Sequence, residues 1–241
     1  DAMFANCSSI ESIDISGFDT RNVTTMINIF VDCDNLTEIV GLDKIETDNL
    51  LYMSGMFGRC GSLTKLDLSN FSTSNVINMD NVFLDCTNLI EIKGLENFNT
   101  SKVKNMGGMF GRCNSLTSVN VSNFDTSNVE EMSNMFLDCN SLISIDVSKF
   151  DTSNVKNMYN LFAGCSSLSE SELGQFNTKE VLNMVWMFAG CSSLTSLNLS
   201  SFDTSKVENM ESMFNDCTNL IEIIGLEEFD TTKVNNMGWM F

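Results

Sequence analysis

The chain contains no histidine and no proline, and its 13 basic residues are outnumbered by 32 acidic ones. Histidine is the commonest general base and a common zinc ligand, so its absence argues against both kinds of site. A formal net charge of −19 argues against nucleic acid, which needs clustered lysine and arginine, and against adsorption to an anionic membrane. No apolar run approaches the roughly 20 residues that span a bilayer. We therefore expect a non-enzymatic protein with no cofactor, no metal, no nucleic-acid partner and no membrane span in this segment.

What the chain does contain is a repeat. Cysteines recur every 26 or 27 residues, and a phenylalanine lies three residues before each of them. The cysteines are Cys7, Cys33, Cys60, Cys86, Cys113, Cys139, Cys165, Cys191 and Cys217. A fixed period of this length is typical of solenoids, in which each unit packs mainly on its neighbours. We expect a single repeat domain over residues 1–241, of about nine units, that begins and ends within a unit and is part of a longer protein.

One unit has two halves with different periods. The residues after Cys60 have leucine-rich-repeat spacing, with apolar side chains at Leu63, Leu66, Leu68 and Phe71. The alternation of apolar and polar residues around Asp67 predicts a short strand from which Asp67 points outward. The second half, exemplified by the stretch 76–86, has apolar residues at steps of three and four, which is typical of a helix. A threonine precedes that half in every unit, from Thr20 to Thr231, where it is predicted to be a helix N-cap.

These patterns predict a curved α/β solenoid. A parallel sheet is expected on one side, short helices or 3-10 turns on the other, and strand-side residues on the inner face. Three units carry one extra residue in the strings EIVGL, EIKGL and EIIGL at 38–42, 91–95 and 222–226. Glycine there predicts a β-bulge that absorbs the insertion.

The cysteine column, the methionine stripe and the Asp/Asn column each have a structural and a chemical interpretation. With no C-x-x-C and an odd number of thiols, the cysteines are predicted to form a buried ladder of small apolar side chains rather than a metal or disulfide site. The 16 methionines mostly share a face with Val and Phe, so we interpret them as core. The column Asp19, Asn99, Asp125, Asp151, Asn177, Asp203 and Asp230 is predicted to form Asx turns, with calcium binding as the alternative.

Departures from the repeat are the signals of specific function. The unit from Cys165 departs most, and it places Leu182, Val185 and Trp186 at positions that are polar or glycine in most other units. Tyr159 precedes them by one unit, and Trp239 repeats the Trp186 column. Exposed aromatic residues on a polar face often mark a contact site, so we hypothesise a partner patch. The alternative is that these side chains cover gaps in the solenoid wall.

The strand positions offer a second candidate surface. The residues proposed there are Asp67, Asn120, Asp146, Glu172 and Asn198. Short polar and acidic side chains on an inner face would suit a basic protein segment or a hydrated glycan.

The consensus MFxxCxSLTSLxLSxFDTSNVxNMxxMF, matched by residues 191–214 in CSSLTSLNLSSFDTSKVENMESMF, resembles the repeat of BspA-like leucine-rich repeat surface proteins, which also occurs in mycoplasma lipoproteins. The resemblance covers the whole chain. It implies a secreted bacterial or protist surface protein associated with adhesion to host proteins, other cells or matrix, and it brings no catalytic residues.

We therefore expect an extracellular, cell-surface adhesin or protein-interaction scaffold. Its partner is a protein or a host or matrix surface ligand, and the acidic composition favours a basic one, whereas a glycan ligand is disfavoured because few units carry an exposed aromatic residue. A structural stalk that displays another domain, and a carbohydrate-binding array, remain the alternatives. End-to-end self-association through apolar coil edges is also expected to be possible.

Overall fold

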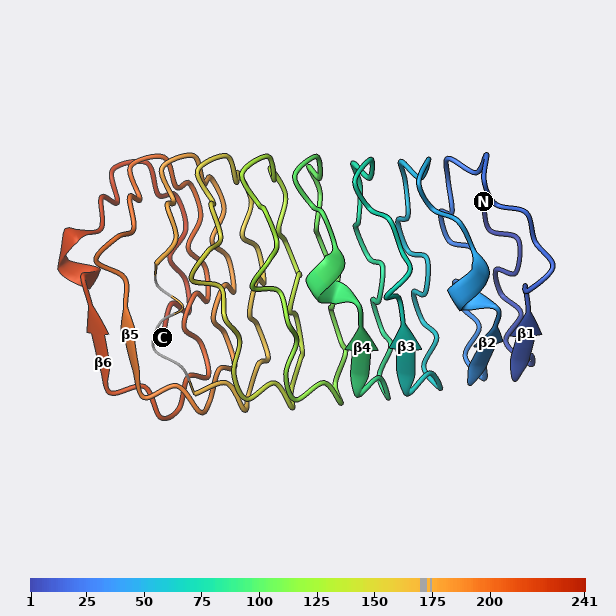
Figure 1. Cartoon of the computed structure of the whole chain (residues 1–241). Helices are drawn as coiled ribbons and strands as arrows, with labels where there is room; N and C mark the ends of the chain where they lie inside the picture. The colour runs from blue at the N-terminus through green and yellow to red at the C-terminus, as the bar shows by residue number, and fades with distance from the viewer. Residues whose placement is uncertain (170–172, 174) are drawn as a thin grey trace.

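The alternation at the start of each unit produces short strands that turn one apolar side chain inward. In the computed structural model, which describes residues 1–169, 173 and 175–241, these strands are β1 (Ser12–Asp14), β2 (Glu38–Val40), β3 (Lys65–Asp67), β4 (Glu91–Lys93), β5 (Ser196–Asn198) and β6 (Glu222–Ile224). Figure 1 shows one continuous stack of coils, with the strands rising on the near side as the chain advances to the left, which makes the solenoid right-handed. The predicted curved leucine-rich-repeat-like solenoid is confirmed.

Within the described residues, the parallel sheet is divided into three pairs. β1 pairs with β2, β3 with β4 and β5 with β6, each in register over three residues. We predicted a sheet formed by all nine units, and that extent was wrong. The second strand of every pair lies in a unit with the extra glycine. Just after the strands, one further backbone hydrogen bond joins the two coils, such as the one from Leu68 N to Lys93 O at 2.9 Å.

The opposite side consists of tight turns and contains no α-helix within the described residues. Hydrogen bonds there join residue i to residue i−3, as from Met56 N to Met53 O and from Cys60 N to Phe57 O. Two residues per unit, five and one before each cysteine, have left-handed backbone conformations, as Asn81 (φ 57°) and Asp85 (φ 59°) do. Such residues interrupt a helix, so the three-and-four spacing of the sequence reflects successive 3-10-type turns rather than one helical segment.

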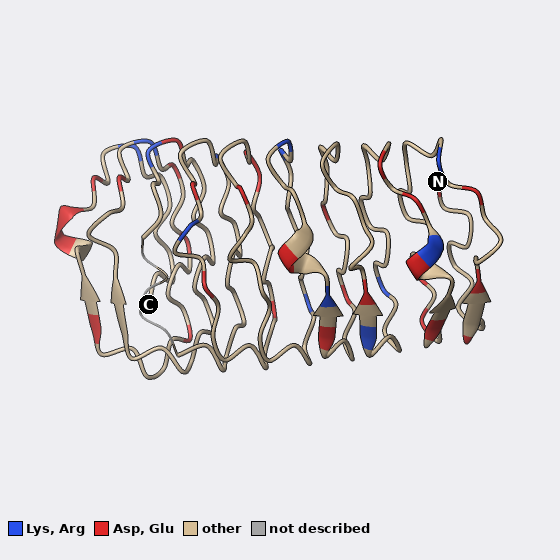
Figure 2. Ribbon diagram, viewed as in Figure 1, with Lys and Arg blue, Asp and Glu red and all other residues tan. Residues whose placement is uncertain are grey.

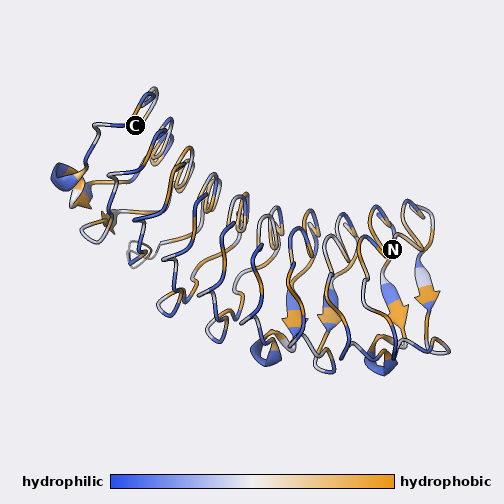
Figure 3. Ribbon diagram, turned by 90° about the horizontal axis from the view of Figure 1, so that it is seen from above, coloured by the Kyte–Doolittle hydropathy of each residue, from blue (hydrophilic) through white to orange (hydrophobic). Residues whose placement is uncertain are grey.

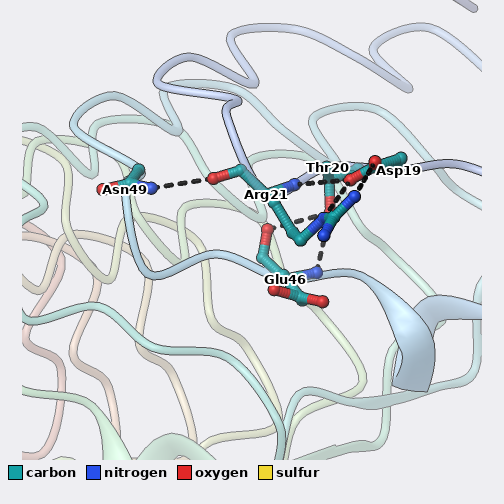
Figure 4. Close-up of polar contacts among 5 residues, drawn as sticks. All are labelled: Asp19, Thr20, Arg21, Glu46 and Asn49. Atoms are coloured by element: carbon teal, nitrogen blue, oxygen red, sulfur yellow. Dashed lines mark hydrogen bonds and ion pairs between the residues drawn. The ribbon is translucent and has the colours of Figure 1, made fainter.

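The threonine column ties neighbouring coils together and does not cap helices, so the N-cap prediction was wrong. The Thr20 hydroxyl donates to the Glu46 carbonyl at 2.9 Å and accepts from the Glu46 N–H at 2.7 Å, as Figure 4 shows. On the neighbouring residues, the amide of Asn49 donates to Arg21 O at 2.7 Å. The threonine at this position is buried in eight successive units, so the column is an internal ladder of side-chain bonds.

The three extra residues are absorbed by 3-10 helices, not by the β-bulges that we predicted. The helices are η1 (Leu42–Lys44), η2 (Leu95–Asn97) and η4 (Leu226–Glu228), and the residue before each is a left-handed glycine: Gly41, Gly94 or Gly225. A Cβ at Gly94 would lie 2.5 Å from the backbone of the preceding coil, so only glycine fits. The helical turn takes up the additional residue while Leu42 and Leu95 still point into the core.

The core is one continuous column of stacked side chains. The phenylalanines three residues before the cysteines stack from coil to coil, with ring centroids 5.5–6.0 Å apart from Phe30 to Phe214. Cysteines from Cys33 to Cys191 are buried, and each thiol donates to a backbone carbonyl of the preceding coil, as Cys60 Sγ does to Phe30 O at 3.1 Å. No helix of the described chain is long and apolar enough to cross a bilayer.

The direction of curvature differs from the prediction. In Figure 3 the strands and 3-10 helices follow the longer, outer arc, and the tight turns follow the shorter, inner one. Ring spacings agree, because the phenylalanines after the strands are farther apart, at 6.5 Å for Phe98–Phe124 and 6.4 Å for Phe202–Phe229. Bulky strand-side turns and η helices therefore widen one side, and the strand positions do not line the inner face.

Candidate partner-binding site

One position of the inner face requires a left-handed backbone, and two units carry a tryptophan there. The residue five before each cysteine has positive φ, and in most units it is Asn or Gly, the residues that tolerate this conformation. Trp186 occupies the position with φ 58° and Trp239 the equivalent one with φ 56°. A bulky residue in left-handed conformation is a conformational outlier, and such outliers concentrate at functional sites. Trp186 is therefore the first residue of the candidate site.

A groove of about 380 Å³ lies beside Trp186 and crosses several coils. Tyr159 and Trp186 line it as aromatic residues, 36% and 41% exposed. Gly164 and Gly190 line it where other coils carry longer side chains, and Asp138 and Asp216 line it as carboxylates. The combination of aromatic rings, bare backbone and negative charge suits a cationic or amphipathic side chain.

The carboxylates belong to a ladder of alternating charge formed by the residue directly before each cysteine from Cys33 to Cys217. In order, this column reads Asp32, Arg59, Asp85, Arg112, Asp138, Gly164, Gly190 and Asp216. Arg59 lies 3.1 Å from Asp32 and 3.8 Å from Asp85, and Arg112 lies 3.6 Å from Asp85 and 3.5 Å from Asp138. Each arginine thus bridges the carboxylates of the coils before and after it. The ladder stops at the two glycines, at the groove.

The predicted patch is brought together only in part. Tyr159 and Trp186 share the groove, whereas Leu182 is exposed but does not line it. Val185 is buried at 7% exposure and belongs to the wall, so its assignment to an exposed patch was wrong. Trp239 is 78% exposed in the last coil, away from the groove.

The strand residues mainly hold their own turns. The side-chain oxygens of Asp67, Asn120, Asp146 and Asn198 each accept from the backbone N–H and the hydroxyl of the serine two residues later. These bonds lower the pKa of Asp67 and Asp146, and the bond from the serine hydroxyl has a larger effect than the bond from the backbone N–H. Because this surface is on the outer arc and its acceptors are occupied, it is a weaker candidate. Glu172 lies outside the described residues.

The Asp/Asn column forms the predicted Asx turns, as from Ser101 N to Asn99 Oδ1 at 3.1 Å and from Ser127 N to Asp125 Oδ1 at 3.0 Å. At the first of these turns, Arg21 hydrogen-bonds Asp19 and lowers the pKa of that carboxyl to about 2. The described residues contain no group of three or more possible protein ligands positioned for a metal ion. The carboxylates of this column thus have a local structural role.

The buried thiols have little nucleophilic character. Burial raises the pKa of Cys86 and of Cys139 to about 12, and a thiol reacts as its thiolate. Cys7 and Cys217, at the two ends, are half-buried. The cysteine column packs as the predicted ladder of small side chains.

Sequence reasoning missed Asp138, Gly164, Gly190 and Asp216. Their signal was present in the alternation of Asp and Arg before successive cysteines and in its interruption by two glycines. The net negative charge itself is spread along the array, as Figure 2 shows, so composition alone does not locate the groove.

Comparison with known proteins finds a family model that matches the chain along its length. A family model described as "Mycoplasma protein of unknown function, DUF285" matches residues 1–94, 67–171 and 142–241. No curated protein matches the chain.

Among solved structures, the chain is similar to a leucine-rich repeat protein from Bacteroides ovatus, with 21% identity, 88% of this chain and 54% of that chain covered, and a TM-score of 0.48. It is also similar to a leucine rich cell surface protein from Faecalibacterium prausnitzii, with 16% identity, coverage of 92% and 74%, and a TM-score of 0.35. For the T. pallidum leucine-rich repeat protein the identity is 21%, the coverage 72% and 61%, and the TM-score 0.34. The chain spans about half the length of the Bacteroides protein.

The family model spans the repeat array from the first residue to the last, in the overlapping matches that tandem units produce. The leucine spacing and the stacked coils account for that match, and the expected resemblance to BspA-like leucine-rich repeat proteins is supported. The chain belongs to the mycoplasma family described as DUF285 and is a leucine-rich-repeat solenoid.

Proposed function

We propose that this chain is a non-enzymatic protein-interaction scaffold that acts as an adhesin at a cell surface, and that it engages its protein partner through the groove beside Trp186. The observation that carries the proposal is a tryptophan in the left-handed position of the inner face, where most other units have Asn or Gly. Trp and Tyr in a partly enclosed pocket are the residue types that dominate binding energy at protein interfaces.

The remainder of the repeat supports this choice of surface. Leucine, phenylalanine, methionine and cysteine fill the core, threonine joins neighbouring coils, and the Asx residues hold their own turns. Side chains with such structural roles recur from unit to unit, whereas the groove occurs at one place in the sequence pattern. A protein partner fits better than a glycan, because aromatic platforms are not repeated along the coils.

The test is binding of the purified chain to a panel of immobilised extracellular-matrix and serum proteins, with a glycan array in parallel. Trp186→Asn installs the residue that four other units carry at this position and should preserve the fold. We expect it to weaken protein binding at least about tenfold, as loss of an interface hot spot does. Leu182→Ala is the matched control, because Leu182 is similarly exposed outside the groove, and it should change binding less than about twofold.

Three results would overturn the proposal. If Trp186→Asn and Leu182→Ala bind like the parent, the groove is not the contact surface. If the chain binds nothing on the panel, the stalk interpretation stands, and binding to glycans alone would favour the carbohydrate-binding array.

A further inference from the structure

The ladder of alternating charge shows what this column does with a guanidinium group. Arg59 and Arg112 project from left-handed positions and reach carboxylates on the coils before and after them, at 3.1–3.8 Å. Both arginine side chains remain more than half exposed while they do so. The inner face therefore holds arginine side chains along the solenoid axis, one at every second coil of the ladder.

The gap at Gly164 and Gly190 leaves two successive positions of the column without a side chain, next to Arg112, which also lines the groove. Asp138 forms an ion pair with Arg112 of the preceding ladder position. Its carboxylate also lies against Gly164, where a Cβ added to the glycine would collide with Asp138 Oδ1. Asp216 borders Gly190 on the far side of the gap, and within the described part of the chain it makes no ion pair. Two vacant column positions thus lie between two carboxylates.

The aromatic residues flank the same gap. Tyr159 and Trp186 line the groove together with both glycines and both carboxylates. A guanidinium is planar, stacks on aromatic rings and forms paired hydrogen bonds to carboxylates, whereas a lysine ammonium is a more strongly hydrated point charge. The groove combines the two features that discriminate in favour of arginine.

We propose that this gap receives two arginine side chains from an extended segment of a protein partner, one over Gly164 beside Asp138 and one over Gly190 beside Asp216. Alternate residues of an extended chain point to the same side and are roughly 6.6–7 Å apart. The coils here are somewhat closer, with ring centroids 6.0 Å apart for Phe162–Phe188 and for Phe188–Phe214, and the long, flexible arginine side chains can take up the difference. The segment recognised is therefore Arg-x-Arg, running along the solenoid axis. This proposal rests on the proposed function and specifies its ligand.

The experiment uses the peptide acetyl-Gly-Arg-Gly-Arg-Gly-amide and the full chain with Trp239→Asn, so that Trp186 is the sole tryptophan and its fluorescence reports on the groove. We expect saturable quenching or a spectral shift at micromolar to millimolar peptide, weakening as salt rises. A peptide with citrulline in place of both arginines keeps the shape but removes the charge, and it should bind at least tenfold more weakly. Equal binding of the two peptides, or no response to either, would overturn the proposal.

The second test uses a variant in which the chain itself places an arginine at one of the two glycine positions. Gly190→Arg should be accommodated, because arginine already occupies the equivalent left-handed position in two coils and the nearest atom to an added Cβ is 3.4 Å away. The new guanidinium should pair with Asp216 and lower affinity for the arginine peptide at least fivefold. Gly190→Ala adds a Cβ without the charge and should stay within twofold. Unchanged binding by Gly190→Arg, with an unchanged circular dichroism spectrum, would refute the site.

Failure of this inference is distinguishable from failure of the proposed function. If Trp186→Asn abolishes partner binding on the protein panel but the arginine and citrulline peptides behave alike, the scaffold stands and the arginine specificity falls. If the arginine peptide binds and Gly190→Arg blocks it, the specificity stands whatever the panel contains.

Discussion

The Thr73 hydroxyl and the backbone of Asn99, one coil later, satisfy each other: Oγ1 donates to Asn99 O at 3.1 Å and accepts from Asn99 N at 2.8 Å. Thr73 is buried at 2% exposure, so its hydroxyl depends on these two bonds. An intercoil bond of this kind is a joint between units, because its two partners are 26 residues apart in the chain. The stability of the solenoid should therefore depend on such joints.

Thr73→Val keeps the shape of the side chain but leaves the Asn99 N–H and carbonyl without a partner. We expect the free energy of unfolding to fall by about 1–3 kcal/mol, the cost of stranding buried polar groups. Urea denaturation followed by circular dichroism measures it. Thr73→Ser is the control, since it retains the hydroxyl and loses one methyl, at a cost of about 1 kcal/mol or less. Equal losses in the two variants would show that the hydroxyl is not the stabilising group.

Gly94→Ala tests how the extra residue is accommodated. Gly94 has φ 89°, and a Cβ would lie 2.5 Å from Leu68 C and from Ser69 N. We expect a loss of at least about 1–2 kcal/mol from the backbone conformation alone, with the overlap adding to it. Gly17→Ala should be nearly neutral in the same urea experiment, because no atom lies within 4 Å of its added Cβ. A neutral Gly94→Ala would contradict the close approach of the coils.

Thiol reactivity tests the cysteine ladder. In the native chain at pH 8, Cys7 and Cys217 should react with a thiol reagent well before the seven buried cysteines, and close to nine thiols should titrate in denaturant. Fewer thiols in denaturant, by an even number, would reveal disulfides.

Alkaline pH should weaken the fold through the same thiols. Burial raises the pKa of Cys86 to about 12, whereas a thiol in the unfolded chain titrates near about 8.5. The folded state therefore disfavours thiolate, and the stability that this contributes is complete below the unfolded pKa and is lost as pH rises from there towards 12. Each such thiol changes the unfolding free energy by up to about 1.4 kcal/mol per pH unit in that window. A Cys86→Ala variant should show a shallower dependence, and an identical slope would contradict the assignment.

Acid pH should weaken the turns. Hydrogen bonds from Ser69 and Ser148 lower the pKa of Asp67 and Asp146, and Arg21 lowers that of Asp19 to about 2. Carboxyls with a depressed pKa stabilise the fold above their unfolded pKa and lose that contribution as pH falls, so unfolding should become easier between about pH 4 and pH 2. Asp67→Asn keeps the acceptor oxygen without the charge and should flatten this dependence in urea titrations at several pH values. A curve parallel to that of the parent would exclude Asp67 as a contributor.

Part of the structure of this protein could be predicted from the sequence, because the repeat places equivalent residues in equivalent surroundings. The period of the cysteines, the inward leucines of the strands and the stacked phenylalanines could be predicted, since a stack of similar coils repeats each environment at 26 or 27 residues. The Asx turns could also be predicted, because their bonds span only two residues. The helix-like spacing led to a wrong prediction of short helices, because two left-handed residues in each unit divide that segment into separate turns.

The repeat pattern alone was enough to predict the solenoid, its period and the side chains that fill its core. The concave side could be identified only from the packing of the coils, because curvature is the small difference between a 6.4–6.5 Å spacing behind the strands and a 5.5–6.0 Å spacing under the tight turns. It also decided that Tyr159, Trp186, two glycines and two carboxylates from different coils share one groove. Local periodicity describes what each coil presents, whereas a site formed across coils depends on how closely they stack.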